Sequence, residues 1–451
     1  MPDKPLILLH LSDPHFGPKS HWDKPDPAET ALIYLDEIQQ ALRSFALMSP
    51  KGFDAIVLSG DCTWGPAAYI ADPDHRRGFD IMRQFLSRLV PDWIPAEQNI
   101  LIVPGNHDVL WGAVDPRTSQ RVFLTRSEAE ARYRNMLKQA FPSDVRRVNP
   151  HLSWPATVRK DGHAYILFGL NSTRIEHPEV AGVGYVGYDQ LCRLSLDAQE
   201  LDGPSTLVVI LHHHLNALST GLETLAESSG ARPSFVVDSD SLLETLNQAG
   251  TAAVLHGHLH EKKGWSYSLP PLLPTAVCGA GSIGICVGSK QIFAPHQFQV
   301  LEIWPKEVIC HSLTAKLQPQ GKDRTWEYEC CRFENRGHAD RPSAHLTRLC
   351  DDMKERRSRV ALMLFESCLL YDAVQREAPQ GKKQLSLRVR PLYERKYGAI
   401  DAAFEVNFEN ALSRLFADYP PGRSLELHRR FFSEETPLWV LLWREYFPKS
   451  S

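Results

Sequence analysis

Six short apolar segments recur along the chain, and each ends in glycine or in polar residues. They are PLILLHLSD (5–13), FDAIVLSGD (53–61), NILIVPGNHD (99–108), HAYILFGLNS (163–172), TLVVILHHH (206–214) and TAAVLHGHLH (251–260). Continuous apolar runs of this length are typical of strands that are buried on both faces. Between them, residues 28–47 and 77–90 carry apolar side chains at the three- and four-residue spacing of helices. This alternation predicts a layered α/β fold.

The first apolar segment ends in Asp13 and His15, two residues apart. In α/β sheets, ligands bind just beyond the carboxyl ends of the strands, so polar residues at these ends are candidates for a site. If the strand continues to His15, its two-residue period aims both side chains to the same side. We therefore expect the carboxylate and the imidazole to converge on one point, as the donors of a chelate do.

Two further strand ends place a glycine directly before residues with chemistry. The glycine of SGD allows a tight turn before Asp61, whose two carboxylate oxygens can bridge two cations. The glycine of GNHD precedes Asn106, which offers a carbonyl oxygen to a metal. His107 and Asp108 match a general acid and the carboxylate that orients it. Taken singly, each motif is also an ordinary turn, which leaves a purely structural role open.

Histidines are concentrated at the last two strand ends. Six of the 19 histidines lie in HHH (212–214) and HGHLH (256–260), a concentration that core packing does not require. His258 and His260 repeat the two-residue spacing, and neutral imidazoles are the commonest metal ligands. We interpret the other histidines near these strand ends as packed or hydrogen-bonded side chains: His10, His213, His214 and His256.

Taken together, the motifs DxH, GD, GNHD, HH and GHxH, in this order, resemble those of the calcineurin-like metallophosphoesterases. The wording HLSDPHFG, SGD, VPGNHD and HGHLH is most similar to the bacterial phosphodiesterase branch of that family. The resemblance covers residues 5–315. It implies the family's four-layer α/β fold, a sandwich of two β-sheets flanked by helices, with the site at the strand ends.

The resemblance also implies two divalent metal ions, of Mn, Fe or Zn, because no cysteine is among the ligands. Seven side chains make up the implied ligand set: Asp13, His15 and His260 for one ion, Asn106, His212 and His258 for the other, and Asp61 as the bridge between them. His213 is the alternative to His212 in this set.

The implied ligand set carries a chemistry with it. Two divalent ions balanced by two carboxylates keep a surplus of about two positive charges, which attracts a phosphate ester and acidifies a bridging water. The resulting hydroxide attacks phosphorus in line. His107 then protonates the leaving oxygen as the catalytic acid, and Asp108 holds its ring.

This chemistry predicts an enzyme, a metal-dependent phosphoesterase that hydrolyses phosphodiester bonds, of a nucleotide-type substrate that includes cyclic nucleotides. A nuclease and a phosphomonoesterase or protein phosphatase stay open, since the same metal pair serves them all. A third interpretation is a non-enzymatic adaptor. Residues 1–340 carry a net charge of −8, against +4 from residue 341 onward, which argues against broad nucleic-acid affinity without excluding a nucleic-acid substrate.

The rest of the chain divides at about residue 340. We predict a catalytic domain over residues 1–320 and an accessory α or α/β domain over residues 340–451, whose aromatic residues need a surface to pack against, in the chain or on a protein partner. Residues 111–142 are an insertion with five arginines, which is a lid or a solvated helix face. We expect VCGAGSIGIC (277–286) to be a loop.

The chain lacks the signals of export. Its nine cysteines form no CxxC pair, its first residues lack the basic region of a signal peptide, and no apolar run reaches the length of a membrane span. We therefore expect a cytoplasmic protein with reduced thiols and no contact with a membrane.

Overall fold

The computed structural model describes the chain in segments between residues 4 and 334. The described residues are 4–17, 24–48, 52–63, 77–90, 92–94, 96–109, 112–114, 121–123, 126–142, 154–173, 182, 184–186, 190, 205–215, 236, 239–248, 250–260, 262–267, 274–284, 296–316 and 325–334. The predicted accessory domain lies outside them, so the predicted division into two domains stays a prediction.

The first of two six-stranded sheets has the strand order β14-β13-β12-β1-β2-β3. β1 lies parallel to β2, and β2 to β3, whereas β12, β13 and β14 continue the sheet on the other side of β1 as antiparallel neighbours. The bounds are β1 Leu6–Leu11, β2 Ala55–Leu58, β3 Ile100–Ile102, β12 Gln297–Ile303, β13 Glu307–Ala315 and β14 Trp326–Glu334. The parallel strands β1, β2 and β3 therefore end at the same rim.

The second sheet has the strand order β10-β11-β9-β8-β7-β6. Its four central strands are parallel and its two outer strands antiparallel to their neighbours. The bounds are β6 Trp154–Lys160, β7 His163–Gly169, β8 Ser205–Ile210, β9 Thr251–His256, β10 Lys263–Tyr267 and β11 Thr275–Gly279. All residues of β7, β8, β9 and β11 are buried, which explains why β7, β8 and β9 are continuous apolar runs in the sequence.

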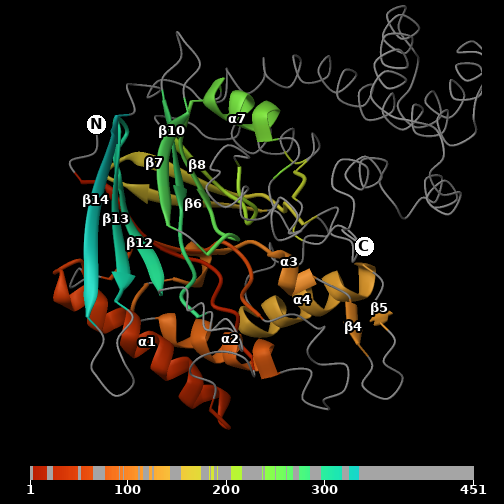
Figure 1. Ribbon diagram of the computed structural model, residues 1–451. Helices are drawn as coiled ribbons and strands as arrows, with labels where there is room; N and C mark the ends of the chain where they lie inside the picture. The colour runs from red at the N-terminus through yellow and green to blue at the C-terminus, as the bar shows by residue number, and fades with distance from the viewer. Residues whose placement is uncertain are drawn as a thin grey trace, which may run out of the picture. The chain divides into compact units, whose positions relative to one another are not determined.

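The described helices lie outside the sheets. They and the small hairpin are α1 Pro27–Ser44, α2 Arg77–Leu89, η2 Glu97–Asn99, α3 Asn106–Val109, β4 Gly112–Val114, β5 Arg121–Phe123, α4 Arg126–Ala140 and α7 Ser239–Gln248. α1 begins at Pro27 because the Asp26 side chain accepts a hydrogen bond from the N–H of Ala28 at 2.9 Å. Its buried stripe includes Tyr34 and Ile38, and Figure 1 shows α1 and α2 together beneath the first sheet.

One hydrophobic core joins the two sheets. Buried side chains of the first sheet, such as Leu8 and Val300, belong to the same cluster as Val208 and Leu255 of the second. The helices α1 and α2 add their buried faces to that cluster from the opposite side of the first sheet. Helices, sheet, sheet and helix therefore make up the layered α/β sandwich, and the predicted fold class is confirmed.

Several local predictions can be compared with these elements. All six predicted strands and both predicted helices are present. The loop predicted at residues 277–286 is wrong at its start, because residues 277–279 belong to β11, where pairing with both β9 and β10 buries them. In the described part of the chain, no helix is both long and apolar enough to cross a membrane.

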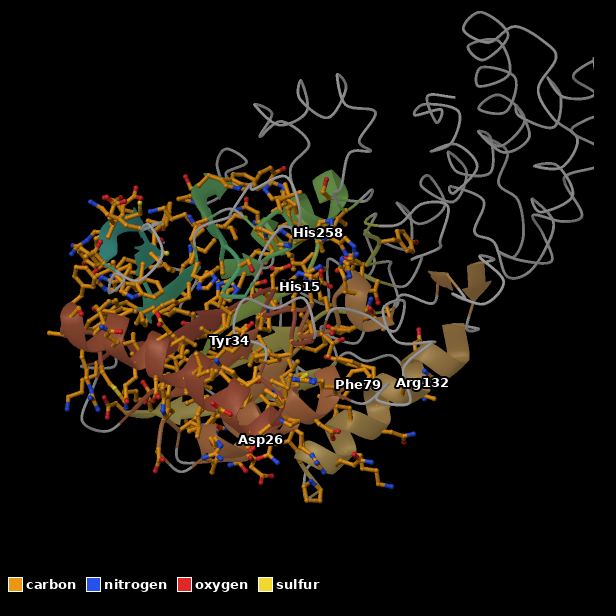
Figure 2. All side chains as sticks on the ribbon, turned by 60° about the horizontal axis from the view of Figure 1, so that its bottom comes forward. His15, Asp26, Tyr34, Phe79, Arg132 and His258 are labelled. Atoms are coloured by element: carbon orange, nitrogen blue, oxygen red, sulfur yellow. The ribbon has the colours of Figure 1, made fainter. Side chains whose placement is uncertain are left out.

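In the predicted insertion, α4 has a buried face with Tyr133 and Leu137, and Arg132 on its exposed side. Figure 2 shows Arg132 apart from His15 and His258. Arg134 pairs with Glu130 along the same helix at 3.3 Å. These contacts favour the solvated helix face over the lid for the described part of the insertion.

Candidate metal centre

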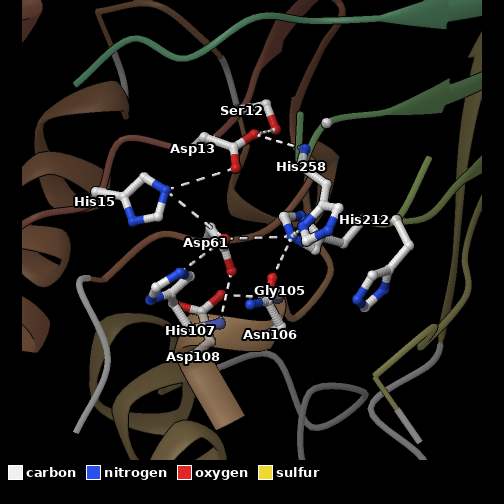
Figure 3. Close-up of polar contacts among 12 residues, drawn as sticks. Ser12, Asp13, His15, Asp61, Gly105, Asn106, His107, Asp108, His212 and His258 are labelled. Atoms are coloured by element: carbon white, nitrogen blue, oxygen red, sulfur yellow. Dashed lines mark hydrogen bonds and ion pairs between the residues drawn. The ribbon is translucent and has the colours of Figure 1, made fainter. Parts of the chain in front are cut away.

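The predicted metal ligands follow β1, β2, β3, β8 and β9, on loops except for Asn106, which begins α3. Figure 3 labels all of them except His260. β1 ends at Leu11, so strand alternation does not reach Asp13 and His15, and that part of the prediction is wrong. Both residues instead have a left-handed backbone, with φ of 51° and 46°. The two side chains still converge. The left-handed backbone of the loop brings them together, rather than alternation along a strand.

Left-handed backbone is concentrated at this rim. Seven of the described non-glycine residues have positive φ, and five of the seven are predicted ligands: Asp13, His15, Asp61, His258 and His260. Each such residue costs about 1 kcal/mol or more, and the strain persists only where neighbouring contacts hold it. Here the loops hold each other, since the N–H of Asp13 donates to the Gly60 carbonyl at 3.1 Å and that of His15 to the Asp61 carbonyl at 3.0 Å.

Three ligands, Asp13, His15 and His260, form what we call the first ligand group. Oδ1 of Asp13 lies 3.6 Å from Nε2 of His15 and 3.3 Å from Nε2 of His260, and the two Nε2 atoms are 3.3 Å apart. Oδ2 of Asp13 is engaged by the Ser12 hydroxyl and by the N–H of His258 at 3.0 Å. One carboxylate oxygen is thereby anchored, and the other faces the two imidazoles.

The α1 helix supports the loop of the first ligand group. The Tyr34 hydroxyl donates to the carbonyl of Pro14, which lies between Asp13 and His15, at 3.2 Å. Figure 2 shows Tyr34 beneath His15. Helix and loop are thereby joined by a buried hydrogen bond.

Three other ligands, Asn106, His212 and His258, form the second ligand group. Nε2 of His212 lies 3.1 Å from Oδ1 of Asn106 and 3.1 Å from Nδ1 of His258. Nδ1 of His212 donates to the backbone carbonyl of Ser59 at 2.7 Å. Because Nδ1 is the donor to the core, Nε2 is the nitrogen presented to the other two ligands.

Asp61 lies between the two ligand groups. Its Oδ2 is 3.7 Å from Nε2 of His15 in the first group and 3.3 Å from Nε2 of His212 in the second. Its Oδ1 accepts the N–H of His107 at 2.8 Å. We predicted that both oxygens of Asp61 bridge two cations, but the structure leaves Oδ2 alone to face both groups.

The charges of the centre follow from its burial. Burial alone raises the pKa of a carboxylate, but the facing histidines outweigh this and hold the pKa values of Asp13 and Asp61 well below the ordinary range. Burial lowers the pKa of His15 to about 4 and that of His258 to about 3. Burial also opposes a charge on His212, yet the carboxylate of Asp61 raises its pKa to about 9. At neutral pH, two anionic and two neutral donors therefore surround one imidazolium.

These donors fit a cation. Oδ1 of Asp13 is a buried atom that accepts no hydrogen bond within the described residues. In the second group, the proton retained by His212 supplies the positive charge on which Asn106, Asp61 and His258 converge. Two sets of donor atoms each lie within 4.8 Å of one another. One set comes from Asp13, His15, Asp61 and His260, and the other from Asp61, His212 and His258. Oxygen and imidazole donors at this spacing suit two divalent ions.

His107 is placed differently from the ligands. It belongs to the helical turn α3, Asn106–Val109, directly after the ligand Asn106. Its side chain is 29% exposed, its Nε2 lies 4.0 Å from Oδ2 of Asp61, and its ring meets that of His15 edge-on at 4.8 Å. The imidazole thus borders the centre from the solvent side.

Asp108 joins two loops of the centre. Its Oδ1 accepts the N–H of Thr63 at 2.9 Å and the Thr63 hydroxyl at 3.2 Å, and its Oδ2 accepts the N–H groups of Cys62 at 3.2 Å and Gly105 at 2.9 Å. Burial and the nearby charge of Asp61 raise the pKa of Asp108 to about 7. Both oxygens are occupied by loop donors, so this geometry favours a structural role for Asp108 over the predicted role of holding the His107 ring.

The four histidines interpreted as packing residues are all buried: His10 and His213 are 0% exposed, His256 1% and His214 2%. His213, the alternative ligand, hydrogen-bonds through Nδ1 to the Ser172 hydroxyl at 2.8 Å. Two serines that precede the motifs were not predicted: Ser12, which contacts Asp13, and Ser59, which contacts His212. Their position next to the motifs is the signal that identifies them.

The sequence matches a known protein family. The family model of the calcineurin-like phosphoesterases matches residues 6–262, which is more than half of the chain. This match includes all seven predicted ligands. No curated protein matches the chain.

Solved structures resemble the chain remotely. Vps29 from Chaetomium thermophilum is 11% identical, covers 74% of this chain and 97% of its own, and gives a TM-score of 0.32. A predicted phosphoesterase from Streptococcus pneumoniae TIGR4 is 13% identical over 71% of this chain and 98% of its own, with a TM-score of 0.23. Vps29 from Entamoeba histolytica, solved with Zn²⁺, is 11% identical over 73% and 98%, with a TM-score of 0.27. Likenesses at this level say nothing about activity.

Proposed function

The chain belongs to the calcineurin-like phosphoesterase family, and from this premise we propose that it hydrolyses phosphodiester bonds of a nucleotide-type substrate, cyclic nucleotides included. Membership makes it a metal-dependent phosphoesterase in general terms. The proposal adds the diester, the nucleotide and the roles of individual residues.

The observation that carries the proposal is Asp61 between the two ligand groups. One of its oxygens faces Nε2 atoms of both groups, at 3.7 Å and 3.3 Å. A carboxylate in that place would serve two ions at once, and a pair of ions is what in-line displacement at phosphorus uses. We assign one ion to Asp13, His15 and His260, and the other to the second ligand group.

When bound, the two ions supply Lewis acidity for the phosphoryl oxygens and lower the pKa of water. The residues of the chain do the rest. Asp13 and Asp61 hold their negative charges at neutral pH, so they receive a cation without giving up a proton. His212 has to release the proton on Nε2 first, because its pKa is raised to about 9.

His107 supplies the proton for the leaving oxygen. Its partly exposed ring lies beside His15 and within 4.0 Å of Asp61. Its backbone N–H is fixed on Oδ1 of Asp61, so the turn that carries it cannot shift without moving the bridge. A general acid so held protonates an alkoxide as the bond to phosphorus breaks.

The wording of the motifs supports the diester, since it is most similar to the phosphodiesterase branch. The five described cysteines, Cys62, Cys278, Cys310, Cys330 and Cys331, are free thiols, which supports a cytoplasmic location. A protein partner for residues 340–451 is retained as a proposal, and those residues lie outside the described part of the chain.

A substrate panel tests the proposal. The metal-free protein is loaded with Mn²⁺ and given bis-p-nitrophenyl phosphate, p-nitrophenyl phosphate, cyclic nucleotides and single-stranded DNA. We expect two Mn²⁺ per chain by metal analysis, chelator-sensitive turnover, and faster cleavage of the diester than of the monoester. The Asp61→Asn variant, purified in parallel, controls for contaminating phosphatases.

Each other result identifies a competing interpretation. Faster cleavage of the monoester indicates a phosphomonoesterase, and preference for DNA indicates a nuclease. Two bound Mn²⁺ without turnover of any substrate favours the non-enzymatic adaptor. Failure to bind Mn²⁺ contradicts the metal centre itself.

A further inference from the structure

A chain of buried hydrogen bonds leads from the second ligand group into the core. Nδ1 of His212 donates to the carbonyl of Ser59 at 2.7 Å, and the hydroxyl of Ser59 lies 2.9 Å from Nε2 of His10. Nδ1 of His10 lies 3.1 Å from Oε1 of Gln299, whose Nε2 donates to the carbonyl of Gly279 at 3.0 Å. His10, Ser59, His212 and Gln299 are each at most 1% exposed. No step of the proposed catalysis uses His10 or Gln299.

The positions of the protons along these hydrogen bonds follow from the end at Gly279. The carbonyl of Gly279 only accepts, so it fixes the amide of Gln299 with its NH₂ toward Gly279 and its oxygen toward His10. Nδ1 of His10 therefore carries a proton and donates to Gln299. Burial lowers the pKa of His10 to about 4, so the ring is neutral and its Nε2 accepts. The Ser59 hydroxyl is consequently the donor to His10.

Ser59 is held at three points as a result. Its N–H donates to the carbonyl of Leu11 at 3.0 Å, its hydroxyl donates to His10, and its carbonyl accepts from His212. The backbone of the next residue, Gly60, packs closely against the His212 ring, because an added Cβ there would lie 2.5 Å from Nδ1 of His212. The carbonyl that selects the tautomer of His212 is thus fixed from the side of His10.

We propose that His10 is a positioning residue: through Ser59 it holds the His212 ring in the orientation and tautomer that the second ligand group needs. The proposal rests on the proposed function, since it takes His212 as a metal ligand. Ser59 hydrogen-bonds the ligand directly, and the loss of such a partner typically changes metal affinity about 10- to 100-fold. His10 acts through Ser59, so we expect its effect at the lower end of that range. The Ser12 hydroxyl, which engages Asp13 of the first ligand group, also lies 3.5 Å from the Ser59 carbonyl, a much longer contact than the 2.7 Å of His212. We therefore expect the effect of His10 to fall mainly on the ion of the second group.

Another buried histidine provides a matched control. His163, at the start of β7, is 3% exposed and hydrogen-bonds through Nε2 to the Thr206 hydroxyl at 2.8 Å. It is a histidine–hydroxyl pair like that of His10 and Ser59, but it lies at the opposite end of its strand from the ligand loops. Removing it costs a similar buried hydrogen bond without touching His212.

The test measures Mn²⁺ binding to the metal-free protein by calorimetry. Variants His15→Ala and Asn106→Ala identify which of the two binding constants belongs to which ligand group. For His10→Phe we expect the Mn²⁺ binding constant of the second group to weaken about 10-fold, with that of the first group within about 3-fold of the wild type. Glutamine has a donor and an acceptor as histidine does, so His10→Gln should bring both constants back to within about 3-fold.

His163→Phe should lower the thermal stability of the metal-free protein about as much as His10→Phe and leave both binding constants unchanged. Unchanged constants in His10→Phe, equal weakening at both groups, or the same weakening in His163→Phe would each overturn the proposal. If His10→Phe does not fold, Ser59→Ala decides, with about 10-fold weaker binding at the second group expected and unchanged binding overturning the proposal. A wild-type chain that binds no Mn²⁺ overturns the proposed function instead, and the role of His10 with it.

Discussion

The two ligand groups share Asp61 and differ in how the protein supports them. In the second group, His212 is 0% exposed and its ring is tied to Ser59 in the core. In the first group, His260 is 28% exposed, and its described contacts are with Asp13 and His15, themselves members of the group. One group is thus built into the interface between the sheets, and the other is completed by a side chain on the open rim.

This difference has a consequence for metal binding. A ligand whose ring is already oriented loses little freedom when an ion arrives, whereas a partly exposed ligand still has to be ordered. We therefore expect the second group to hold its ion more tightly and the first to exchange its ion with solvent. His260 and His107 are both partly exposed, so we expect a substrate to approach from this side.

Asp61→Asn should abolish metal binding at both ligand groups. The amide carries no charge, so both groups lose the anion that they share, and we expect both ions to be lost and the rate to fall roughly 10⁴-fold. Metal analysis and turnover of bis-p-nitrophenyl phosphate measure this. Asp161→Asn is the matched control, because Asp161 has the same φ of 49° in an exposed turn. Loss of only one ion would show that Asp61 serves one group alone.

His107→Ala should affect neither group. The variant keeps both ions, because His107 donates to Asp61 through its backbone, which the substitution retains. Its rate should fall about 10²- to 10⁴-fold on esters with poor leaving groups, and much less on p-nitrophenyl esters, which need little protonation. Equal losses on both kinds of ester, or a lost ion, would make His107 a structural or ligating residue.

His212→Ala and His260→Ala compare the groups directly. Each substitution should weaken the binding of one ion and leave that of the other unchanged. We expect the larger loss of affinity, about 100-fold or more, in His212→Ala, because the core orients that side chain. Calorimetric titration of the metal-free variants with Mn²⁺ gives both constants. A larger loss in His260→Ala would reverse the ranking of the two groups.

Gly60→Ala tests the packing of the second group. Gly60 has φ of +95°, and an added Cβ would lie 2.5 Å from Nδ1 of His212 and 2.8 Å from the backbone of Gly105. We expect a loss of about 2–4 kcal/mol in the free energy of unfolding and weaker binding at the second group. Gly162→Ala separates strain from contact, because Gly162 has φ of +73° and nothing within 4 Å of an added Cβ.

Chemical denaturation of the metal-free proteins measures this pair. Gly162→Ala should lose only the cost of the left-handed backbone, about 1 kcal/mol. If the two variants lose the same free energy of unfolding, the contact with His212 contributes nothing.

Lys262→Gln should have the smallest effect. Lys262 follows the first group's His260 by two residues and pairs with Glu329 at 2.8 Å, but Glu329 is 59% exposed. Solvent screening reduces such a pair to less than about 1 kcal/mol. We expect thermal unfolding and both Mn²⁺ constants to stay close to the wild type. Weakened binding at the first group would mean that the ion pair positions His260.

Much of the fold and the ligand residue types could be read from the sequence, because these properties are local. A short apolar run that ends in glycine or polar residues is typical of a buried strand, and the helix at Pro27–Ser44 follows from the three- and four-residue spacing of its apolar side chains. The outer strand β14 was not predicted, because six of its nine residues are exposed and the other three are half-exposed, so it carries no buried apolar pattern. Such a strand is defined by its neighbour β13 rather than by its own pattern.

The sequence by itself determined which residues stand at the strand ends and that their donors suit divalent ions. Only the tertiary structure decided how they are used. The left-handed backbone of Asp13 and His15 comes from the loop after β2, to which their N–H groups bond. Which oxygen of Asp61 is available depends on the N–H of His107, and the carboxylate of Asp108 is taken up by donors from residues 62, 63 and 105. Hydrogen bonds between loops far apart in sequence make these choices, and no local pattern records them.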